Sequence, residues 1–184
     1  MTPIAKPHFS EYSYGFRPKR RAQQAIVKLL EYFNDGYTYI VDIDLEKFFN
    51  NVLQNKLMSL VQNLINDPDT EPLIRKYLNA GVMIKGKYEK STKGTPQRGN
   101  LSPLLSNIML NQLEARKLHF VKYADDCVII VGSSATANRV MARITKWIEK
   151  NLGFKVNATK SKVTKPMKFK YLGFRFWKNS MDGK

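Results

Sequence analysis

Hydrophobic positions recur every three to four residues in five stretches of this chain, which is the spacing of one face of an α-helix. Two of these stretches have matching end signals: Asn34-Asp35-Gly36 can stop and turn a helix, and Ser102-Pro103 can open one. The first 21 residues, rich in proline, glycine and aromatic residues, are predicted to form an irregular, basic lead-in. Helices are predicted over 22–33, 57–65, 73–78, 102–114 and 137–148.

Alternating apolar and polar residues, or short β-branched runs, predict the strands. Without residues 50–100, the predicted order is β-α-β-β-α-β, the split βαβ arrangement of small α+β sheets. The predicted fold class is therefore α+β, and this topology brings the 38–44 strand beside the 120–131 hairpin. Strands are expected at 38–44 and 154–156, with hairpins over 82–93, 120–131 and 169–176.

Four aspartates lie on two of these segments. Asp125 and Asp126 stand between the two apolar strands of the 120–131 hairpin, and the period of two places Asp42 and Asp44 on one face of the 38–44 strand. Adjacent aspartates are also ordinary turn formers. Carboxylates gathered in one sheet, however, repel one another and are normally neutralised by divalent cations. The pattern indicates a metal site, but it does not choose between Asp42 and Asp44.

The charge of the chain points to a polyanionic partner. Its 184 residues include 31 Lys and Arg against 15 Asp and Glu, a net charge of +16, and residues 138–184 hold 13 basic and 2 acidic residues, a net +11. Such an excess favours nucleic acid over a merely soluble surface. The single Cys127 excludes an internal disulfide and is expected in the core, and His8 and His119 lack partners at zinc-ligand spacing.

Five motifs, taken in order, carry a resemblance to a known family. Over about residues 9–176 they resemble the reverse transcriptases encoded by group II introns, which also act as maturases. This resemblance implies a polymerase palm built on the split βαβ unit, with part of the fingers. The motifs are Ser13-Tyr14-Gly15-Phe16-Arg17-Pro18, Asp44-Leu45-Glu46-Lys47-Phe48-Phe49, Gly94-Thr95-Pro96-Gln97, Leu101-Ser102-Pro103 and Tyr123-Ala124-Asp125-Asp126.

The resemblance also implies a role for each acid. Asp44, Asp125 and Asp126 would be the catalytic residues that hold two divalent metal ions, Mg²⁺ or Mn²⁺, for phosphoryl transfer. Asp44 is preferred to Asp42 because the family places an aromatic residue five positions after its catalytic aspartate, where Phe49 stands. Asp42 would then be structural. Phe49 would screen the sugar 2′ position in favour of deoxynucleotides, with a plain core aromatic as the alternative.

Two further residues gain implied roles in nucleotide binding. Gln97 would line the nucleotide pocket, and Lys160 would neutralise the leaving pyrophosphate, although a surface lysine is an equally good interpretation. The chain departs from the family at two positions: Asn50 replaces the usual Asp, and Arg98 replaces a Gly. A long cation at 98 could obstruct the site.

The ends of the matched region imply contacts with nucleic acid strands. The 172–174 turn resembles the primer grip, in which Gly173 would let the backbone approach the primer. The basic lead-in is a candidate for RNA phosphate contacts, with a solvated loop as the alternative. The primer-grip residues would be Leu172, Gly173 and Phe174, and the RNA-binding residues Arg17, Lys19, Arg20 and Arg21.

On this resemblance, residues 1–184 form one reverse transcriptase domain. Residues 1–36 would belong to the fingers, 37–49 and 101–184 to the palm core, and 50–100 to an insertion shared by palm and fingers. The family's N-terminal fingers motifs, thumb and X domain are expected to be absent from this sequence, so the isolated chain is expected to be a weak polymerase.

We therefore expect an RNA-directed DNA polymerase module of a group II intron-encoded protein, with template or intron RNA, a DNA primer and deoxynucleoside triphosphates as partners. The alternative is a catalytically inactive, truncated RNA-binding remnant, which would not need the acids. A nucleotide cyclase on a related palm is disfavoured, because no Gly-Gly-Asp/Glu-Glu-Phe turn is present. No apolar run approaches the roughly 20 residues of a membrane helix, so a cytoplasmic location is expected, and a homodimer stays open.

Overall fold

The computed structural model describes residues 2–65, 67–84, 87–89, 91, 93–96, 99–114 and 118–177. The chain forms two compact units, each built from interleaved segments. We call them the helical unit (Met1–Glu11, Leu45–Lys117 and Thr145–Val156) and the sheet unit (Tyr12–Asp44, Leu118–Ile144 and Asn157–Lys184). The expected division into fingers and palm stays a prediction, because compactness alone does not define those functional regions.

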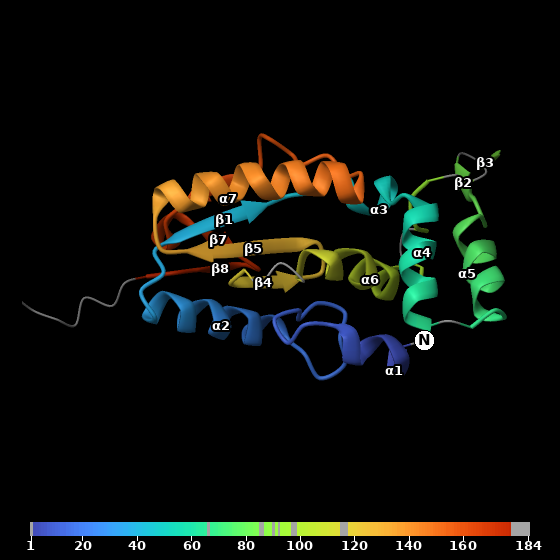
Figure 1. Ribbon diagram of the computed structural model, residues 1–184, viewed down its shortest axis with the longest axis horizontal. Helices are drawn as coiled ribbons and strands as arrows, with labels where there is room; N and C mark the ends of the chain where they lie inside the picture. Colours follow the sequence, from blue (N-terminus) through green and yellow to red (C-terminus); the bar gives the residue numbers. More distant parts are fainter. Residues whose placement is uncertain are drawn as a thin grey trace, which may run out of the picture. The chain divides into compact units, whose positions relative to one another are not determined.

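An antiparallel sheet of four strands forms the centre of the sheet unit (Figure 1). Along the chain, α6 (Ser102–Glu114) separates β1 from β4, and α7 (Ser134–Trp147) separates β5 from β6. This is the predicted β-α-β-β-α-β order, and the α+β fold class is confirmed. In space the strands follow the order β4 (Phe120–Tyr123), β5 (Asp126–Val131), β1 (Tyr39–Ile43) and β6 (Lys162–Thr164).

The prediction of a strand at 154–156 is wrong. Val156 makes only an isolated bridge to Leu45, and pairing with β1 involves β6, where Lys162 lies opposite Asp42. The reason is local: the carboxamide oxygen of Asn157 accepts hydrogen bonds from the backbone N–H groups of Thr159 (3.1 Å) and Lys160 (3.2 Å). These bonds close a turn immediately after Val156, so the extended segment ends there before it can pair as a strand.

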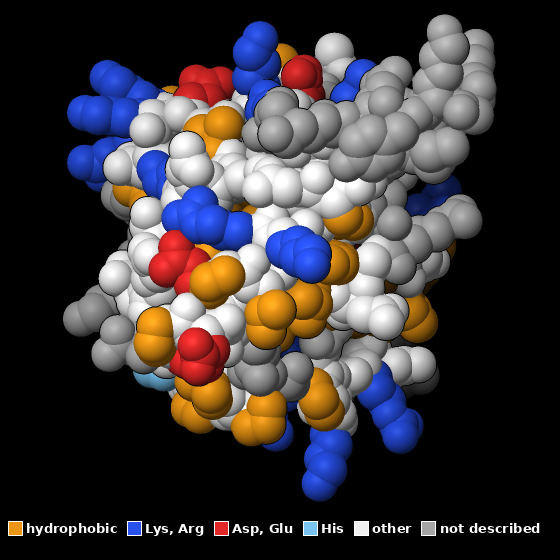
Figure 2. All heavy atoms as spheres, turned by 90° about the vertical axis from the view of Figure 1, so that its right-hand side faces the viewer, with side chains coloured by type: hydrophobic (Ala, Val, Ile, Leu, Met, Phe, Trp, Pro, Cys, Tyr) orange, Lys and Arg blue, Asp and Glu red, His pale blue; other side chains and the backbone are white. Residues whose placement is uncertain are grey.

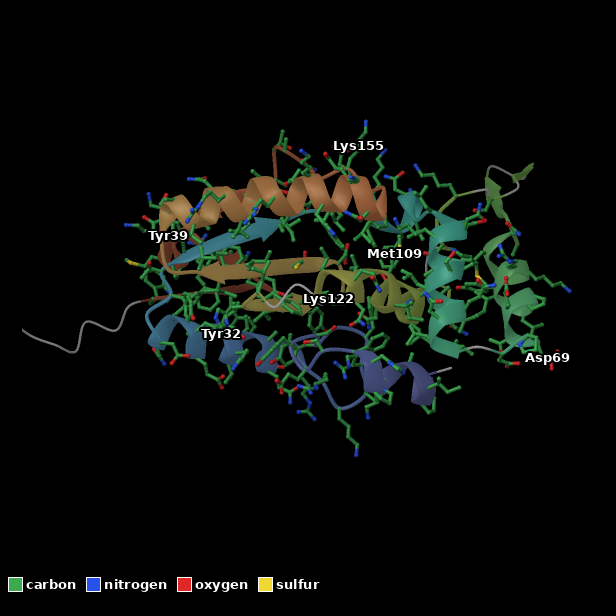
Figure 3. All side chains as sticks on the ribbon, viewed as in Figure 1. Tyr32, Tyr39, Asp69, Met109, Lys122 and Lys155 are labelled. Carbon is green, nitrogen blue, oxygen red and sulfur yellow. The ribbon has the colours of Figure 1, made fainter. Side chains whose placement is uncertain are left out.

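One hydrophobic core holds the sheet unit together. The helix α2 (Ala22–Asn34) buries its apolar face here and lies beside β4 (Figure 1). Removing these side chains from water is the main term that favours the packed state. The core combines Ala25, Ile26, Leu29 and Tyr32 of α2 (Tyr32 is labelled in Figure 3) with Ile40, Val121, Val128 and Ile130 of the sheet and with Phe169, Tyr171 and Phe176 from the C-terminal hairpin region.

The C-terminal hairpin confirms the alternation seen over 169–176. Its strands are β7 (Lys170–Tyr171) and β8 (Phe174–Arg175), and it follows a 3₁₀ turn, η3 (Pro166–Lys168). The turn between the strands uses Leu172 and Gly173, both with positive φ (49° and 89°). Glycine adopts this conformation at little cost, which explains its place there.

The helical unit is built around α4 (Gln54–Ile65), which contacts α5 (Thr70–Leu78), α6 and the short α1 (Thr2–Ala5). It also contains α3 (Phe48–Asn51), the 3₁₀ turn η1 (Lys6–His8) and the π-helical turn η2 (Ile148–Leu152), together with the hairpin of β2 (Val82–Ile84) and β3 (Lys87–Glu89). The predicted helices and the hairpin at 82–93 are confirmed in their described parts. The short α1, α3 and η1 were missed because three or four residues are too few to show a helical period.

Figure 2 looks onto the side of the molecule that carries α4 and α5, where basic side chains are spread and acidic ones are few. This agrees with the net charge of +16.

Cys127 is 4% exposed, in the core position predicted for it. Among the described residues, no helix is both long and apolar enough to cross a lipid bilayer.

Candidate active site

The sheet brings two of the predicted acids opposite one another. Ile43 at the end of β1 pairs with Cys127 of β5 in antiparallel register, so Asp44 comes directly after this pair and Asp126 directly before it. Directly opposed residues of antiparallel strands point to the same face of the sheet. The side chains of Asp44 and Asp126 therefore point to the same face of the sheet. This confirms the prediction that the sheet brings the two acidic segments together.

The backbone of Asp44 is fixed by the turn that precedes β6. Its N–H group donates to the Oγ atom of Ser161 (3.0 Å), and its carbonyl oxygen accepts from the N–H group of Asn157 (2.9 Å). The same turn carries Lys160. It therefore fixes the Asp44 backbone and also places the ammonium group of Lys160 beside the Asp44 carboxylate. The Nζ atom of Lys160 lies 3.7 Å from the Asp44 carboxylate.

A pocket of about 420 Å³ opens at these residues. It is polar, and both charge signs meet in it: acids from β1 and β5 face lysines from the 157–161 turn, β6 and β7. Such a mixture suits a ligand that combines cations with phosphate groups. Its lining residues are Asp42, Ile43, Asp44, Asp126, Thr159, Lys160, Lys162, Lys170, Tyr171 and Leu172.

The electrostatics of the pocket disfavour the simultaneous ionisation of its carboxyl groups. Partial burial raises the pKa of Asp42 to about 6, with Asp126 and Asp44 adding to the rise and Lys162 opposing it. Burial also raises the pKa of Asp126, reinforced by the charges of Asp125 and Asp44. The carboxylates therefore repel one another, and a bound cation would relieve that repulsion.

Asp125 lies in the tight turn between β4 and β5. The residue before it, Ala124, has a φ of 58°, and Tyr123 pairs with Asp126 across the hairpin. Asp125 is partly exposed and does not line the pocket described above. Within the described part of the chain, no three His, Cys, Asp or Glu side chains gather closely enough to hold one metal ion. The structure thus brings Asp44 and Asp126 together, and the metal-ligand roles of all three acids stay a prediction.

A buried tyrosine from the C-terminal hairpin supports the acidic strand. Tyr171 is 4% exposed, and its hydroxyl donates to the backbone carbonyl oxygen of Asp126 (3.3 Å). Burial keeps the pKa of this hydroxyl well above its usual value, so it remains a donor. Tyr171 adjoins Leu172, and it therefore links the predicted primer-grip turn to the strand that carries Asp126.

In the helical unit, the structure joins two segments predicted to bind the nucleotide. Phe49, half-buried in α3, packs against Phe48 with 5.2 Å between ring centroids. Its carbonyl oxygen accepts from the N–H group of Thr95 (2.8 Å), and the N–H group of Gly94 donates to Val52 (2.8 Å). The Gly94-Thr95 loop is therefore anchored to α3. The predicted residue Gln97 and its neighbour at 98 lie outside the described residues.

The remaining predicted residues lie in the sheet unit. Leu172, Gly173 and Phe174 form the β7–β8 turn, where Phe174 is 45% exposed. The basic residues Arg17, Lys19, Arg20 and Arg21 lie in the segment before α2, with Lys19 and Arg21 exposed and the two others partly buried. Their roles in binding a primer or RNA stay predictions.

The family is decided by a match that covers most of the chain. The family model for reverse transcriptase (RNA-dependent DNA polymerase) matches residues 1–176. The chain belongs to the reverse transcriptase family. This confirms the family expected from the five motifs, and enzymes with this domain depend in general on divalent metal ions.

Curated relatives place it near intron-encoded proteins. It is 38% identical over 111 residues to the group II intron-encoded protein LtrA of Lactococcus lactis subsp. cremoris, which covers 60% of this chain and 18% of that protein. It is 30% identical over 205 residues to protein YkfC of Escherichia coli K12, covering 89% and 54% of the two chains. An uncharacterised 91 kDa protein in a cob intron of Schizosaccharomyces pombe is 28% identical, covering 88% and 28%. The chain therefore spans about half the length, or less, of these relatives.

The fold is shared with telomerase. The structure of telomerase from Candida tropicalis with a fragment of telomeric RNA matches with a TM-score of 0.73 at 13% identity, covering 94% of this chain and 34% of that one. At this level of identity the likeness concerns the fold alone. It agrees with the reverse transcriptase palm predicted from the order of strands and helices.

Several residues in or beside the pocket had no functional role predicted from the sequence, among them Asp42, Ser161 and Tyr171. Asp42 was expected to be structural, but it lines the pocket with Asp44. Ser161 stood out only as the neighbour of Lys160, and Tyr171 only as one position of an alternating hairpin. The one usable signal was the spacing Asn157-x-x-Lys160-Ser161, since an Asx turn with a hydroxyl residue at its end is suited to binding backbone groups.

Proposed function

We propose that this chain is the nucleotidyl-transfer module of an RNA-directed DNA polymerase encoded by a group II intron. The observation that carries the proposal is the position of Asp44 and Asp126 on facing strand ends, in one pocket with Lys160. In the proposed reaction, the 3′ oxygen of a DNA primer attacks the α-phosphorus of a deoxynucleoside triphosphate. A new P–O bond forms, the bond to the bridging oxygen breaks, and pyrophosphate leaves.

The acids fit a pair of divalent cations. Carboxylate oxygens are the ligands that Mg²⁺ prefers, and the repulsion between the neighbouring carboxylates of Asp126 and Asp44 is the condition that a cation relieves. We assign Asp44, Asp125 and Asp126 as the residues that would hold Mg²⁺. When bound, such a pair of ions activates the attacking oxygen and stabilises the charge on the leaving oxygen.

The residues around the acids would position the other reactants. Lys160 is 68% exposed and only 3.7 Å from the Asp44 carboxylate, so it can turn from this ion pair toward a triphosphate at small cost. Ser161 holds the Asp44 backbone in place meanwhile. The lysines at 162 and 170 add positive charge to the same pocket, which favours a polyanionic substrate.

Primer extension on an RNA template, with Mg²⁺ and deoxynucleoside triphosphates, tests the proposal. Asp44→Asn and Asp126→Asn should each lower the extension rate at least about 100-fold, because each removes a carboxylate that would hold a cation at the reacting phosphate. Asp35→Asn is the matched control: it removes an exposed carboxylate at the end of α2, in the same unit, and should extend primers like the wild type.

A second candidate is an RNA-binding protein without polymerase activity. The positive charge favours it, because RNA binding needs basic residues but no acid pocket. The same assay separates the two functions. RNA binding without extension, at any concentration of Mg²⁺ or Mn²⁺ and with no difference between Asp44→Asn and Asp35→Asn, would support this second candidate against the first.

A further inference from the structure

In the helical unit, the C-terminal end of α5 is attached to the loop that precedes α6. We call residues 94–96 and 99–101 the Gly94 loop. Helices α4 and α5 lie side by side (Figure 1), and one side chain joins both to this loop. The Nε2 atom of Gln54 donates to the carbonyl oxygens of Leu78 (3.1 Å) and Gly94 (3.0 Å). The Leu78 carbonyl is the last of α5, where carbonyl groups have no partner within their own helix. Gln54 therefore supplies a donor to the helix end and to the loop together.

Tyr77 makes a second attachment through a chain of hydroxyl groups. The Ser102 hydroxyl donates to the carbonyl oxygen of Pro96 (2.5 Å), and the Tyr77 hydroxyl lies 3.0 Å from the Ser102 Oγ atom. A serine hydroxyl has one proton, which the bond to Pro96 uses, so Tyr77 is the donor in the contact with Ser102. Ser102 is 2% exposed and Tyr77 is partly buried, so water competes little for these bonds. The chain therefore runs in one direction, from Tyr77 through Ser102 to Pro96.

Glycine at position 99 makes room for the Tyr77 hydroxyl. A Cβ atom there would lie 1.9 Å from the Tyr77 Oη atom and 3.2 Å from the carbonyl oxygen of Pro96. Backbone bonds hold the same residues: the N–H group of Gly99 donates to Pro96 (3.2 Å), and the N–H group of Ser102 donates to Gly99 (3.1 Å). Pro96 and Gly99, which flank positions 97 and 98, are thus both held by contacts in which Tyr77 takes part.

The other end of the Gly94 loop lies against α3, which carries Phe49. The carbonyl oxygen of Phe49 accepts from the N–H group of Thr95 (2.8 Å), and a Cβ atom at Gly94 would lie 2.8 Å from the same oxygen. Phe49 and this loop are the two segments of the helical unit for which nucleotide contacts are predicted. A path of hydrogen bonds and adjacent residues therefore leads from Tyr77 to Phe49.

We infer that Tyr77 is a positioning residue for nucleotide binding. It acts through Ser102 and Pro96, which hold the Gly94 loop against α3, where Phe49 would meet the sugar. A buried hydroxyl chain whose members are all paired fixes one geometry, and a nucleotide site needs its supports fixed in this way. This inference rests on the proposed function, because it assigns a support to the nucleotide site of that polymerase.

A purely structural role for Tyr77 would have a different kinetic effect. Loss of stability alone lowers the number of active molecules, so it lowers the apparent kcat and leaves KM unchanged. A displaced binding loop instead weakens the binding of the nucleotide and raises its KM. The split between KM and kcat therefore distinguishes the two roles.

The test is steady-state primer extension by the whole chain on an RNA template, with the concentration of one deoxynucleoside triphosphate varied. Tyr77→Phe keeps the ring and removes only the hydroxyl. It should raise the KM for the nucleotide about 2- to 10-fold, the size expected for one hydrogen bond, with kcat within about 2-fold of the wild type. Its affinity for the RNA template should not change.

Further variants test the path itself. Ser102→Ala breaks the same chain at its middle, so the double variant Tyr77→Phe/Ser102→Ala should raise KM no more than the larger single effect, whereas independent effects would multiply. Gln54→Met removes the other attachment with a side chain of similar length, and it should also raise KM. Leu73→Ala, at a 67% exposed site on the same helix, is the matched control and should leave KM and kcat unchanged.

A binding measurement gives the same comparison without turnover. Radiolabelled dATP is titrated against the chain on a template whose primer ends in a dideoxynucleotide, and Tyr77→Phe should bind it more weakly by the same factor as the rise in KM.

The outcomes separate this inference from the proposed function. If the wild type extends primers and Tyr77→Phe shows an unchanged KM, with or without a lower kcat, the inference is overturned and the proposed function stands. Independent, multiplying effects of Tyr77→Phe and Ser102→Ala would also overturn it, because the two hydroxyls would then not form one path. If the wild type neither extends primers nor binds dATP, the proposed function fails and the inference fails with it.

Discussion

Replacing Asp42 with asparagine should stabilise the protein at neutral pH and leave its stability unchanged in acid. The cause lies in the pocket: burial, together with Asp126 and Asp44, raises the pKa of Asp42 from 3.8 to about 6 against the opposing effect of Lys162. The folded state therefore favours the protonated carboxyl. Asparagine keeps nearly the same shape and never ionises.

The sign depends on the two states of the chain. Below about pH 4, Asp42 is protonated in both the folded and the unfolded chain, so its ionisation has no effect on stability. As the pH rises to 6, the unfolded chain releases its proton first, and the free energy of unfolding falls. Above pH 6 the loss is complete. The raised pKa thus contributes stability that is present in acid and lost at neutral pH.

The size of the effect comes from the shift. At about 1.36 kcal/mol per pKa unit, the change from 3.8 to about 6 corresponds to about 3 kcal/mol. Because the carboxyl is only half-buried, water screens part of this energy, and we expect about 1–2 kcal/mol. Asp42→Asn should therefore raise the free energy of unfolding by that amount at pH 8 and by almost nothing at pH 4.

Urea unfolding in EDTA, followed by circular dichroism from pH 4 to pH 8, measures this difference. Asp35→Asn, at an exposed site in the same unit, is the control and should show no comparable gain at pH 8. A gain from Asp42→Asn that is equal at pH 4 and pH 8, or larger at pH 4, would refute the reasoning, because the stabilisation would then not come from ionisation.

Three further outcomes are expected. Gly15→Ala should lower the free energy of unfolding by about 1–3 kcal/mol in urea, because its Cβ would lie 2.0 Å from backbone at the acidic turn, whereas Gly132→Ala, with no atom within 4 Å, should change it little. Ser161→Ala should cost about 1–2 kcal/mol by leaving the Asp44 N–H group without its 3.0 Å acceptor, and equal losses for Ser161→Ala and the exposed Ser59→Ala would speak against this. RNA affinity should fall on the order of 10³-fold between 50 and 200 mM salt if about six phosphates are contacted, and a flat titration would exclude phosphate-driven binding.

The acidic hairpin could be predicted because its signal is local. Apolar β-branched residues flank Tyr123-Ala124-Asp125-Asp126, and β4 and β5 lie where that pattern places them. The facing position of Asp44 is then a consequence of the β-α-β-β-α-β order, which leaves few ways to arrange the strands. Both steps use information that the sequence carries directly.

The fourth strand could not be placed from the pattern alone. Phe154-Lys155-Val156 alternates between apolar and polar residues as a strand does. The alternation instead reflects burial of Phe154 in the core (1% exposed), and the Asn157 turn follows directly after Val156. The true strand, Lys162–Thr164, has three residues and only one large apolar side chain. A strand this short takes its place from pairing with β1 and not from its own hydrophobic period.

The residues that support the acids were hidden for a related reason. The Ser161 hydroxyl reaches Asp44 across 117 positions of sequence, and the Tyr171 hydroxyl reaches Asp126 across 45. Neither hydrogen bond affects the local spacing of apolar and polar residues from which the sequence was interpreted. Asp42 was expected to be structural because its spacing to an aromatic residue does not fit the family motif, yet the period of two already placed it beside Asp44.

A crystal of the protein soaked with Mn²⁺ would test the central claim most directly. Anomalous density identifies Mn²⁺ without reference to turnover, and Asp44→Asn crystals soaked in the same way serve as the control. We predict a peak between the carboxylates of Asp44 and Asp126 that is lost in Asp44→Asn. Full occupancy of other sites with no density between these two acids would contradict a metal-dependent polymerase centre in this pocket.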